Sequence, residues 1–219
     1  MGRSRTWLAK APTIASHGPL TDILIRLMLS VNDISLASDA NDQWALTSDP
    51  RRISRRPGAR MYFIRILLAH VYEALEIIKE ISESPPLRAF LDDCEERTIR
   101  TFQELETFIR SPDMKTLDKM RNRVSFHYDR QLPGKNLKEI AAITREEYWT
   151  YSMGSEPLDW HFKLADAVID RMVIRDVFGL KKPKSLQRSQ ETEVIARQLE
   201  KISITFTDFA AHFVRHYSR

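Results

Sequence analysis

Arg121, Asn122 and His127 lie within one short segment, and their side chains can act together on a phosphodiester. The guanidinium of Arg121 stays charged at physiological pH and can bind a phosphate through a planar fork of donors. The imidazole of His127 can transfer a proton near pH 7. Asn122 supplies a donor and an acceptor that can orient Arg121 or a phosphate oxygen. The segment therefore predicts phosphoryl chemistry without a metal, with these three residues as the candidate catalytic groups.

The spacing of Arg121 and His127 limits what one copy of the segment can do. A helix is expected from about 114 to 126, so the segment lies near the end of that helix and before a loop. Because an ideal helix turns about 100° per residue, the two side chains lie about 120° apart around its axis. A complete site therefore needs a second element or a second copy of the segment. The plainer interpretation is a solvated face on which Arg121 and Arg123 complement the negative end of the helix dipole.

The sequence RNRVSFHYD at 121–129 resembles the R-x4-6-H signature of the HEPN superfamily, with Asn122 at the polar position that often follows its arginine. The resemblance implies an all-α bundle that dimerises so that two such segments face each other across one cleft. It also implies, for many members, a metal-independent endoribonuclease, and for others a non-catalytic binding module. HEPN toxins paired with a small nucleotidyltransferase commonly carry a tyrosine two residues after the histidine. Here that position is Asp129 and Tyr128 directly follows His127, so this regulation is not expected.

The enzyme that the resemblance implies would cleave RNA by attack of a 2′-hydroxyl on the neighbouring phosphate. His127 would act as general base or acid, and Arg121 would stabilise charge on the phosphate oxygens. A homodimer and an antitoxin or defence partner protein are further implications of the resemblance. Two alternatives stay open: a non-catalytic dimeric module that binds nucleotide, RNA or protein, and a helical scaffold in which the segment is only a capped helix end. No cofactor is expected, and His127 with Asp129 is too small a set to predict a metal site.

A run of arginines is the second feature that could contact RNA. Six arginines fall between positions 51 and 65 with no acidic residue among them. Such a cluster can follow a nucleic-acid backbone, but it is equally typical of a solvated, flexible connection. A second basic cluster, Lys181, Lys182, Lys184 and Arg188, allows the same two interpretations. The predicted RNA-binding residues are Arg51, Arg52, Arg55, Arg56 and Arg123.

A second arginine and histidine pair, Arg65 and His70, shows that spacing alone is weak evidence. His70 lies in a strongly apolar helix beside Leu67, Leu68 and Val71. Such a helix face usually serves packing, so a core or interface histidine is expected there.

The elements that position these residues are predicted to be helices. Apolar residues recur at three- and four-residue spacing over long segments, and no series of strands with turn signals is present. The expected fold is an all-α, HEPN-like bundle with five to six main helices in a single domain, 1–219. A basic loop is expected around 38–60, and the structure of 131–157 is left open apart from a short helix near 137–143. The main helices are predicted at about 20–36, 59–83, 87–109, 114–126, 158–177 and 189–216.

Composition agrees with a folded, soluble chain. Of 219 residues, 42% are hydrophobic and 29% are charged, close to the averages of globular proteins. The net charge of +4 permits nucleic-acid binding without requiring it. The single cysteine, Cys94, is flanked by acidic residues that are expected to raise its pKa, and it indicates a reducing compartment. Because no long apolar run or signal-peptide core is present, a cytoplasmic protein without membrane association is expected.

Overall fold

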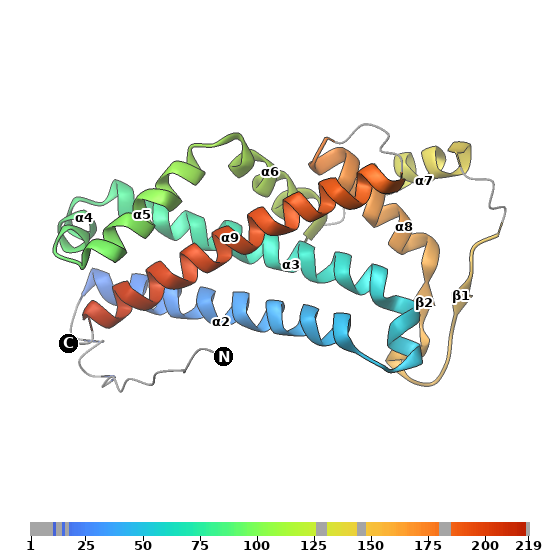
Figure 1. Cartoon of the computed structure of the whole chain (residues 1–219), viewed down its shortest axis with the longest axis horizontal. Coiled ribbons are helices and arrows are strands. Elements are labelled where there is room, and N and C mark those ends of the chain that lie inside the picture. Colours follow the sequence, from blue (N-terminus) through green and yellow to red (C-terminus); the bar gives the residue numbers. More distant parts are fainter. Residues whose placement is uncertain are drawn as a thin grey trace.

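The structure, a computed structural model of the 219-residue chain, describes Ala11, Ala15 and residues 18–125, 131–143, 148–179 and 185–217. For positions 19, 185–196 and 199 the description is limited to the backbone. Within these ranges nearly all of the regular structure is helical (Figure 1). The predicted all-α class is confirmed.

The described ranges contain long and short helices and one small pair of strands. The α-helices are α2 (Pro19–Leu46), α3 (Pro50–Glu83), α4 (Pro85–Asp92), α5 (Glu96–Ile109), α6 (Pro112–Met120), α7 (Leu132–Ile143), α8 (Lys163–Arg171) and α9 (Ser185–Tyr217). π-Helical segments follow α6 at Arg121–Ser125 and α8 at Met172–Val177. A 3-10 helix, Pro157–Asp159, separates the strands β1 (Tyr151–Ser152) and β2 (His161–Phe162), which pair antiparallel. None of the helices in these ranges has the length and apolar character that a bilayer crossing requires.

Proline residues and capping side chains define where two of the helices begin. Pro50 opens α3, and the carboxylate of Asp49 accepts a hydrogen bond from the main-chain N–H of Arg51 at 2.9 Å. Pro112 opens α6 in the same way, after the N-cap Ser111. Proline suits this position because its fixed φ is helical and its missing N–H would have no partner within the helix. The residue at which α6 begins determines which of its residues face the core, and so on which side of the helix Arg121 lies.

The long helix α3 is the centre of the bundle. It runs antiparallel to α2 and packs against α5, α6, α8 and α9 (Figure 1). Helix α9 crosses the bundle and packs against α5 and α2. The largest fully buried side chains include Phe102 from α5 and Phe206, Phe209 and Phe213 from α9. This core fixes α3, which in turn supports the segment that carries Arg121.

The predicted loop at 38–60 is wrong. Helix α2 continues to Leu46 and α3 begins at Pro50, so only three residues, 47–49, connect them. The polar end of α2 is supported locally, since Gln43 donates to the Asp39 carboxylate one turn away at 2.7 Å. Pro57 removes one main-chain hydrogen bond from α3 without ending the helix. The arginines that follow position 50 are therefore arranged on a helix.

Two other predicted helices are divided. The segment 87–109 forms α4 and α5, with a break at 93–95 where Glu95 is the N-cap of the second helix. The segment 158–177 begins in the 3-10 helix, passes through β2 and continues as α8 and a π-helical segment, after which Gly179 has a positive φ of 68°. The long C-terminal helix predicted at 189–216 is confirmed by α9. Within the described part of 131–157, the short helix predicted near 137–143 is part of the longer α7, and β1 follows it.

Cys94 is a buried free cysteine between α4 and α5. Burial, followed by the nearby carboxylates of Asp93 and Glu95, raises the pKa of Cys94 to about 11. The predicted direction is confirmed, with burial as the larger cause. The thiol is therefore protonated at physiological pH.

Candidate functional site around Arg121

Arg121 and Asn122 lie where α6 widens into the π-helical segment. Leu117, Met120 and Val124 form a buried stripe at three- and four-residue spacing, which turns this face of the segment toward the core. Arg121 and Asn122 lie off that stripe, and Asn122 is exposed. π-Helical turns are rare and occur frequently at functional sites. Local structure therefore marks the segment that the residue types point to, although Met172–Val177 is π-helical as well.

Two hydrogen bonds to α3 hold the end of the π-helical segment. Arg65 Nη1 donates to the carbonyl oxygen of Val124 at 3.0 Å, and Ser125 Oγ donates to the carbonyl oxygen of Arg65 at 2.9 Å. Arg65 is buried, so its donation to the Val124 carbonyl joins α3 to the π-helical segment in the interior of the protein. These contacts fix the segment against α3.

Neighbouring polar side chains orient the guanidinium of Arg121. Its Nε donates to Glu73 Oε1 at 2.9 Å, and its Nη1 donates to Asn122 Oδ1 at 2.8 Å. Asn122 Nδ2 donates in turn to Asp118 Oδ1 at 2.7 Å. The side chain of Arg121 nevertheless keeps 40% of its surface exposed. It is thus accessible to a ligand and already ordered, which lowers the entropy cost of binding.

Tyr72 lies beside the same guanidinium. Its ring centroid is 6.0 Å from the central carbon of the Arg121 guanidinium, at the outer limit of a cation–π contact. Burial raises the pKa of Tyr72 above its ordinary value, and the carboxylates of Glu76 and Asp118 raise it further. The phenol is therefore neutral at physiological pH and does not act as a base there.

The structure brings together two of the three predicted catalytic residues, Arg121 and Asn122. His127 lies outside the described residues, as do Tyr128 and Asp129. Arg123 is described and exposed. The second basic cluster, 181–188, lies outside the described side chains. Within the described ranges, no three His, Cys, Asp or Glu side chains are grouped so that they could hold a metal ion.

Glu73 and Asp118 belong to the site although no sequence pattern singled them out. Glu73 lies 48 residues before Arg121 on a different helix, so spacing along the chain cannot pair the two. Asp118 carries a weak signal, because it precedes Asn122 by four residues and side chains at that spacing meet on a helix.

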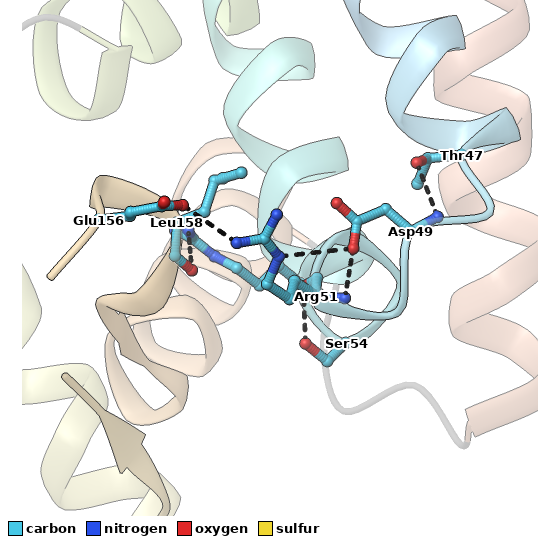
Figure 2. Close-up of polar contacts among 7 residues, drawn as sticks. Thr47, Asp49, Arg51, Ser54, Glu156 and Leu158 are labelled. Carbon is cyan, nitrogen blue, oxygen red and sulfur yellow. Dashed lines mark hydrogen bonds and ion pairs between the residues drawn. The ribbon is translucent and has the colours of Figure 1, made fainter. Parts of the chain in front are cut away.

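Arg51 and Arg55 join the start of α3 to the 3-10 segment before β2. Arg51 Nη1 lies 3.1 Å from Glu156 Oε2, and Arg51 Nε lies 3.7 Å from Asp49 Oδ1. Figure 2 shows both ion pairs as dashed lines. Arg55 Nη1 donates to the carbonyl oxygen of Leu158 at 3.4 Å. These contacts tie two parts of the chain that are far apart in sequence.

Arg52 and Arg56 face the connection between α2 and α3. The guanidinium of Arg52 lies 5.5 Å from the ring centroid of Trp44, and Arg56 donates to the carbonyl oxygen of Thr47. The four arginines predicted to bind RNA near position 50 therefore all contact other parts of the chain. These contacts give the cluster a structural role, while the side chain of Arg51 is still 54% exposed and accessible to a ligand.

The arginine cluster and Arg121 lie at separate places along α3. Arg121 contacts Glu73, which is about 22 residues beyond Arg51 on α3, or roughly 30 Å at 1.5 Å per residue. One protomer therefore does not combine the cluster and Arg121 in a single pocket. An RNA that reaches both must extend along the bundle.

The pair Arg65 and His70 is not a second copy of the site. His70 lies partly buried between α2 and α3, with its Nδ1 3.6 Å from Asp33 Oδ2. Arg65 is buried and bonded to the main chain. The expectation of a core or interface histidine at position 70 is confirmed, since His70 packs between two helices.

Comparisons with family models, curated proteins and solved structures found no match to this chain. Its class is therefore defined by the fold and the site alone. The chain is an all-α helical protein that presents an oriented, exposed arginine on a π-helical turn.

Proposed function

We propose that this protein is a metal-independent endoribonuclease of HEPN type. The observation that carries the proposal is the state of Arg121, which is exposed yet held in orientation by Glu73 and Asn122. A guanidinium fixed in advance stabilises negative charge on a reacting phosphate without reorganisation during the reaction. The sequence places His127 six residues later, which supplies the proton-transfer group.

In the proposed reaction, His127 removes the proton from a ribose 2′-hydroxyl, whose oxygen attacks the adjacent phosphorus. The bond from phosphorus to the 5′-oxygen breaks, and that oxygen takes up a proton from the protonated His127 or from water. The products are a 2′,3′-cyclic phosphate and a 5′-hydroxyl. Arg121 stabilises charge on the non-bridging oxygens while Asn122 keeps the guanidinium aligned. DNA lacks the attacking hydroxyl and is not expected to be cleaved.

A homodimer completes the proposed site, because two copies supply Arg121 and His127 twice across one cleft. The exposed position of Arg121 leaves it accessible to a second copy. The proposed setting is the cytoplasm, with an antitoxin or defence protein as partner. The dimer, the setting and the partner follow from the HEPN resemblance of residues 121–129.

A non-catalytic HEPN-like module that binds nucleotide, RNA or protein is the second candidate. The ion pair between Arg121 and Glu73 favours it over the enzyme, because the carboxylate offsets part of the positive charge that would stabilise the additional negative charge of a transition state. In such a module Arg121 and Asn122 bind the anionic group of the ligand, and His127 only donates or accepts a hydrogen bond.

The test of the enzyme is incubation of the purified protein with a mixed RNA pool in EDTA, followed by determination of the product ends. The proposal predicts 2′,3′-cyclic phosphate and 5′-hydroxyl ends from RNA, with DNA of the same sequence left intact. RNA binding without cleavage would replace the enzyme with the binding module.

Removing the negative charge of Glu73 is expected to strengthen RNA binding. In Glu73→Gln the amide oxygen can still accept from Arg121, but the charge of the guanidinium is no longer offset. An exposed ion pair contributes up to about 1 kcal/mol, so the dissociation constant should fall by at most about fivefold. Fluorescence anisotropy with a labelled single-stranded RNA measures this change.

Glu83→Gln is the matched control for that variant. Glu83 is exposed on the same helix and its replacement changes the net charge by the same amount. If both variants strengthen binding equally, the effect belongs to the overall charge, and Arg121 is not the residue that contacts the phosphate.

Replacing the arginine cluster tests its proposed contact with RNA. For Arg51→Ala, Arg52→Ala and Arg55→Ala together, we expect weaker binding and a slope of log affinity against log salt that is smaller by about 2, since each phosphate contact on a single strand contributes about 0.7. Binding titrations at several salt concentrations measure the slope.

Glu156→Ala distinguishes two causes of weaker binding, the loss of RNA contacts and the displacement of the 3-10 segment that Arg51 holds. This variant breaks the same ion pair with Arg51 but removes no positive charge. If it weakens RNA binding as much as the triple variant does, or if the triple variant binds normally, the cluster has only a structural role.

A further inference from the structure

A pocket of about 850 Å³ lies between α3, α7 and α8. Most of its lining is apolar, and three of its large side chains, Tyr62, Leu137 and Phe162, are exposed to solvent. Pockets of this size and character bind small molecules. Large apolar side chains gathered in one hollow, rather than scattered singly over the surface, indicate a site that another group covers.

Arg65 lines this pocket and is only 7% exposed. Its Nη1 donates to the carbonyl oxygen of Val124, whereas its Nε is buried without a hydrogen-bond partner in the described part of the chain. The ring of Tyr62 lies 5.8 Å from its guanidinium carbon. The contacts that the structure gives Arg65 thus include no carboxylate from the described residues. A buried charge without a counter-charge is unfavourable, because burial removes the water that solvates it.

The other charged groups of the lining leave the pocket with an excess of positive charge. Arg55 lines it together with Arg65. Asp166, the carboxylate among the described lining residues, already has a partner, since its Oδ2 lies 2.8 Å from His161 Nε2. Its carboxyl group packs against Gly58, where the missing Cβ leaves room for it. A ligand with a negative group therefore complements this pocket better than a neutral or cationic one does.

We propose that the pocket binds a small amphipathic anion, an apolar body that carries one carboxylate. The carboxylate pairs with the guanidinium of Arg65, whose planar fork of donors suits a carboxylate. The apolar body covers Tyr62, Leu137 and Phe162 and fills the space between α3, α7 and α8. This site is distinct from Arg121 and does not depend on the ribonuclease proposal.

Isothermal titration calorimetry of the full chain with three probes tests the proposal. Decanoate carries both the apolar body and the carboxylate, decanol carries the body alone, and acetate carries the carboxylate alone. We expect decanoate, below its micelle concentration, to bind at least tenfold more tightly than decanol, and acetate to give no measurable heat over the same range. Absence of decanoate binding, or equal affinity for decanoate and decanol, would overturn the proposal.

Arg65→Met tests whether Arg65 is the residue that selects decanoate over decanol. Methionine keeps an unbranched side chain and removes the charge. We expect decanoate affinity to fall at least tenfold while decanol affinity changes by less than about threefold. Arg60→Met is the control, since Arg60 is exposed on the same helix and its loss removes the same charge outside the pocket. A folded Arg65→Met that binds decanoate as well as the wild type overturns the proposal. If circular dichroism shows that Arg65→Met is unfolded, the comparison of decanoate with decanol in the wild type decides.

Discussion

Replacing His127 with alanine is expected to lower the rate of RNA cleavage by about 100-fold or more, which is the usual contribution of a general acid or base. Arg121→Ala is expected to cost about 100- to 1000-fold, because it removes a donor that stabilises the charge developing on the phosphate. Single-turnover cleavage of a defined RNA in EDTA measures both rates. Circular dichroism checks that both variants keep the helical content of the wild type.

Two residues of this chain provide matched controls. His70 follows Arg65 in a similar arginine and histidine spacing, but it lies between α2 and α3 beside Asp33. Lys119 is an exposed cation on α6, two residues before Arg121. His70→Ala and Lys119→Ala should both cleave RNA at the rate of the wild type. Equal cleavage by the folded His127→Ala, Arg121→Ala and wild-type proteins would show that the activity does not arise at this site.

A mixture of the two inactive variants tests whether the site is shared between protomers. In a mixed dimer, the His127→Ala protomer supplies Arg121 and the Arg121→Ala protomer supplies His127, so one of the two arginine and histidine pairs is intact. Random association would then restore up to about a quarter of the wild-type activity, because half of the dimers would carry one intact pair. No recovery after verified exchange of subunits would assign each pair to a single protomer.

The long helices were predictable because burial imposes a period on the sequence. The terminal helix α9 and most of α3 follow from apolar residues at three- and four-residue spacing. The same criterion failed at 38–60, where α2 and the start of α3 are mainly polar and exposed. There the helices are supported by side-chain contacts such as Gln43 with Asp39 and Arg52 with Trp44, which apolar periodicity does not reveal.

The candidate site likewise contains one contact that the sequence predicts and others that it does not. Arg121 and Asn122 are adjacent in the chain, so their contact was predictable from sequence. Glu73 is brought to Arg121 only by the packing of α3 against α6, and no local pattern predicts it. The burial of Arg65 was also unexpected, because arginine is rarely buried without a carboxylate partner. In both cases the informative feature is a charged side chain on α3 whose partner is remote in sequence.

Phe209→Ala is expected to destabilise the protein by about 3–5 kcal/mol, the usual cost of truncating a buried phenylalanine. Phe209 is fully buried on α9, and its ring centroid lies 5.5 Å from that of Phe102 and 5.3 Å from that of Phe213. Truncation leaves a cavity where α9 packs on α5, and the surrounding rings can close it only in part. The midpoint of urea unfolding, followed by circular dichroism, should fall while the slope of the transition is unchanged.

Ile204→Ala on the same helix is the control for this packing argument. Ile204 is 61% exposed, so its replacement should change the free energy of unfolding by less than about 0.5 kcal/mol. A large difference between the two variants means that the contact of α9 with α5 contributes to the stability of the whole bundle, including the face of α3 that holds Glu73. If Phe209→Ala were as mild as Ile204→Ala, α9 would not be part of the cooperative core, and α3 would depend on α2, α6 and α8 for its position.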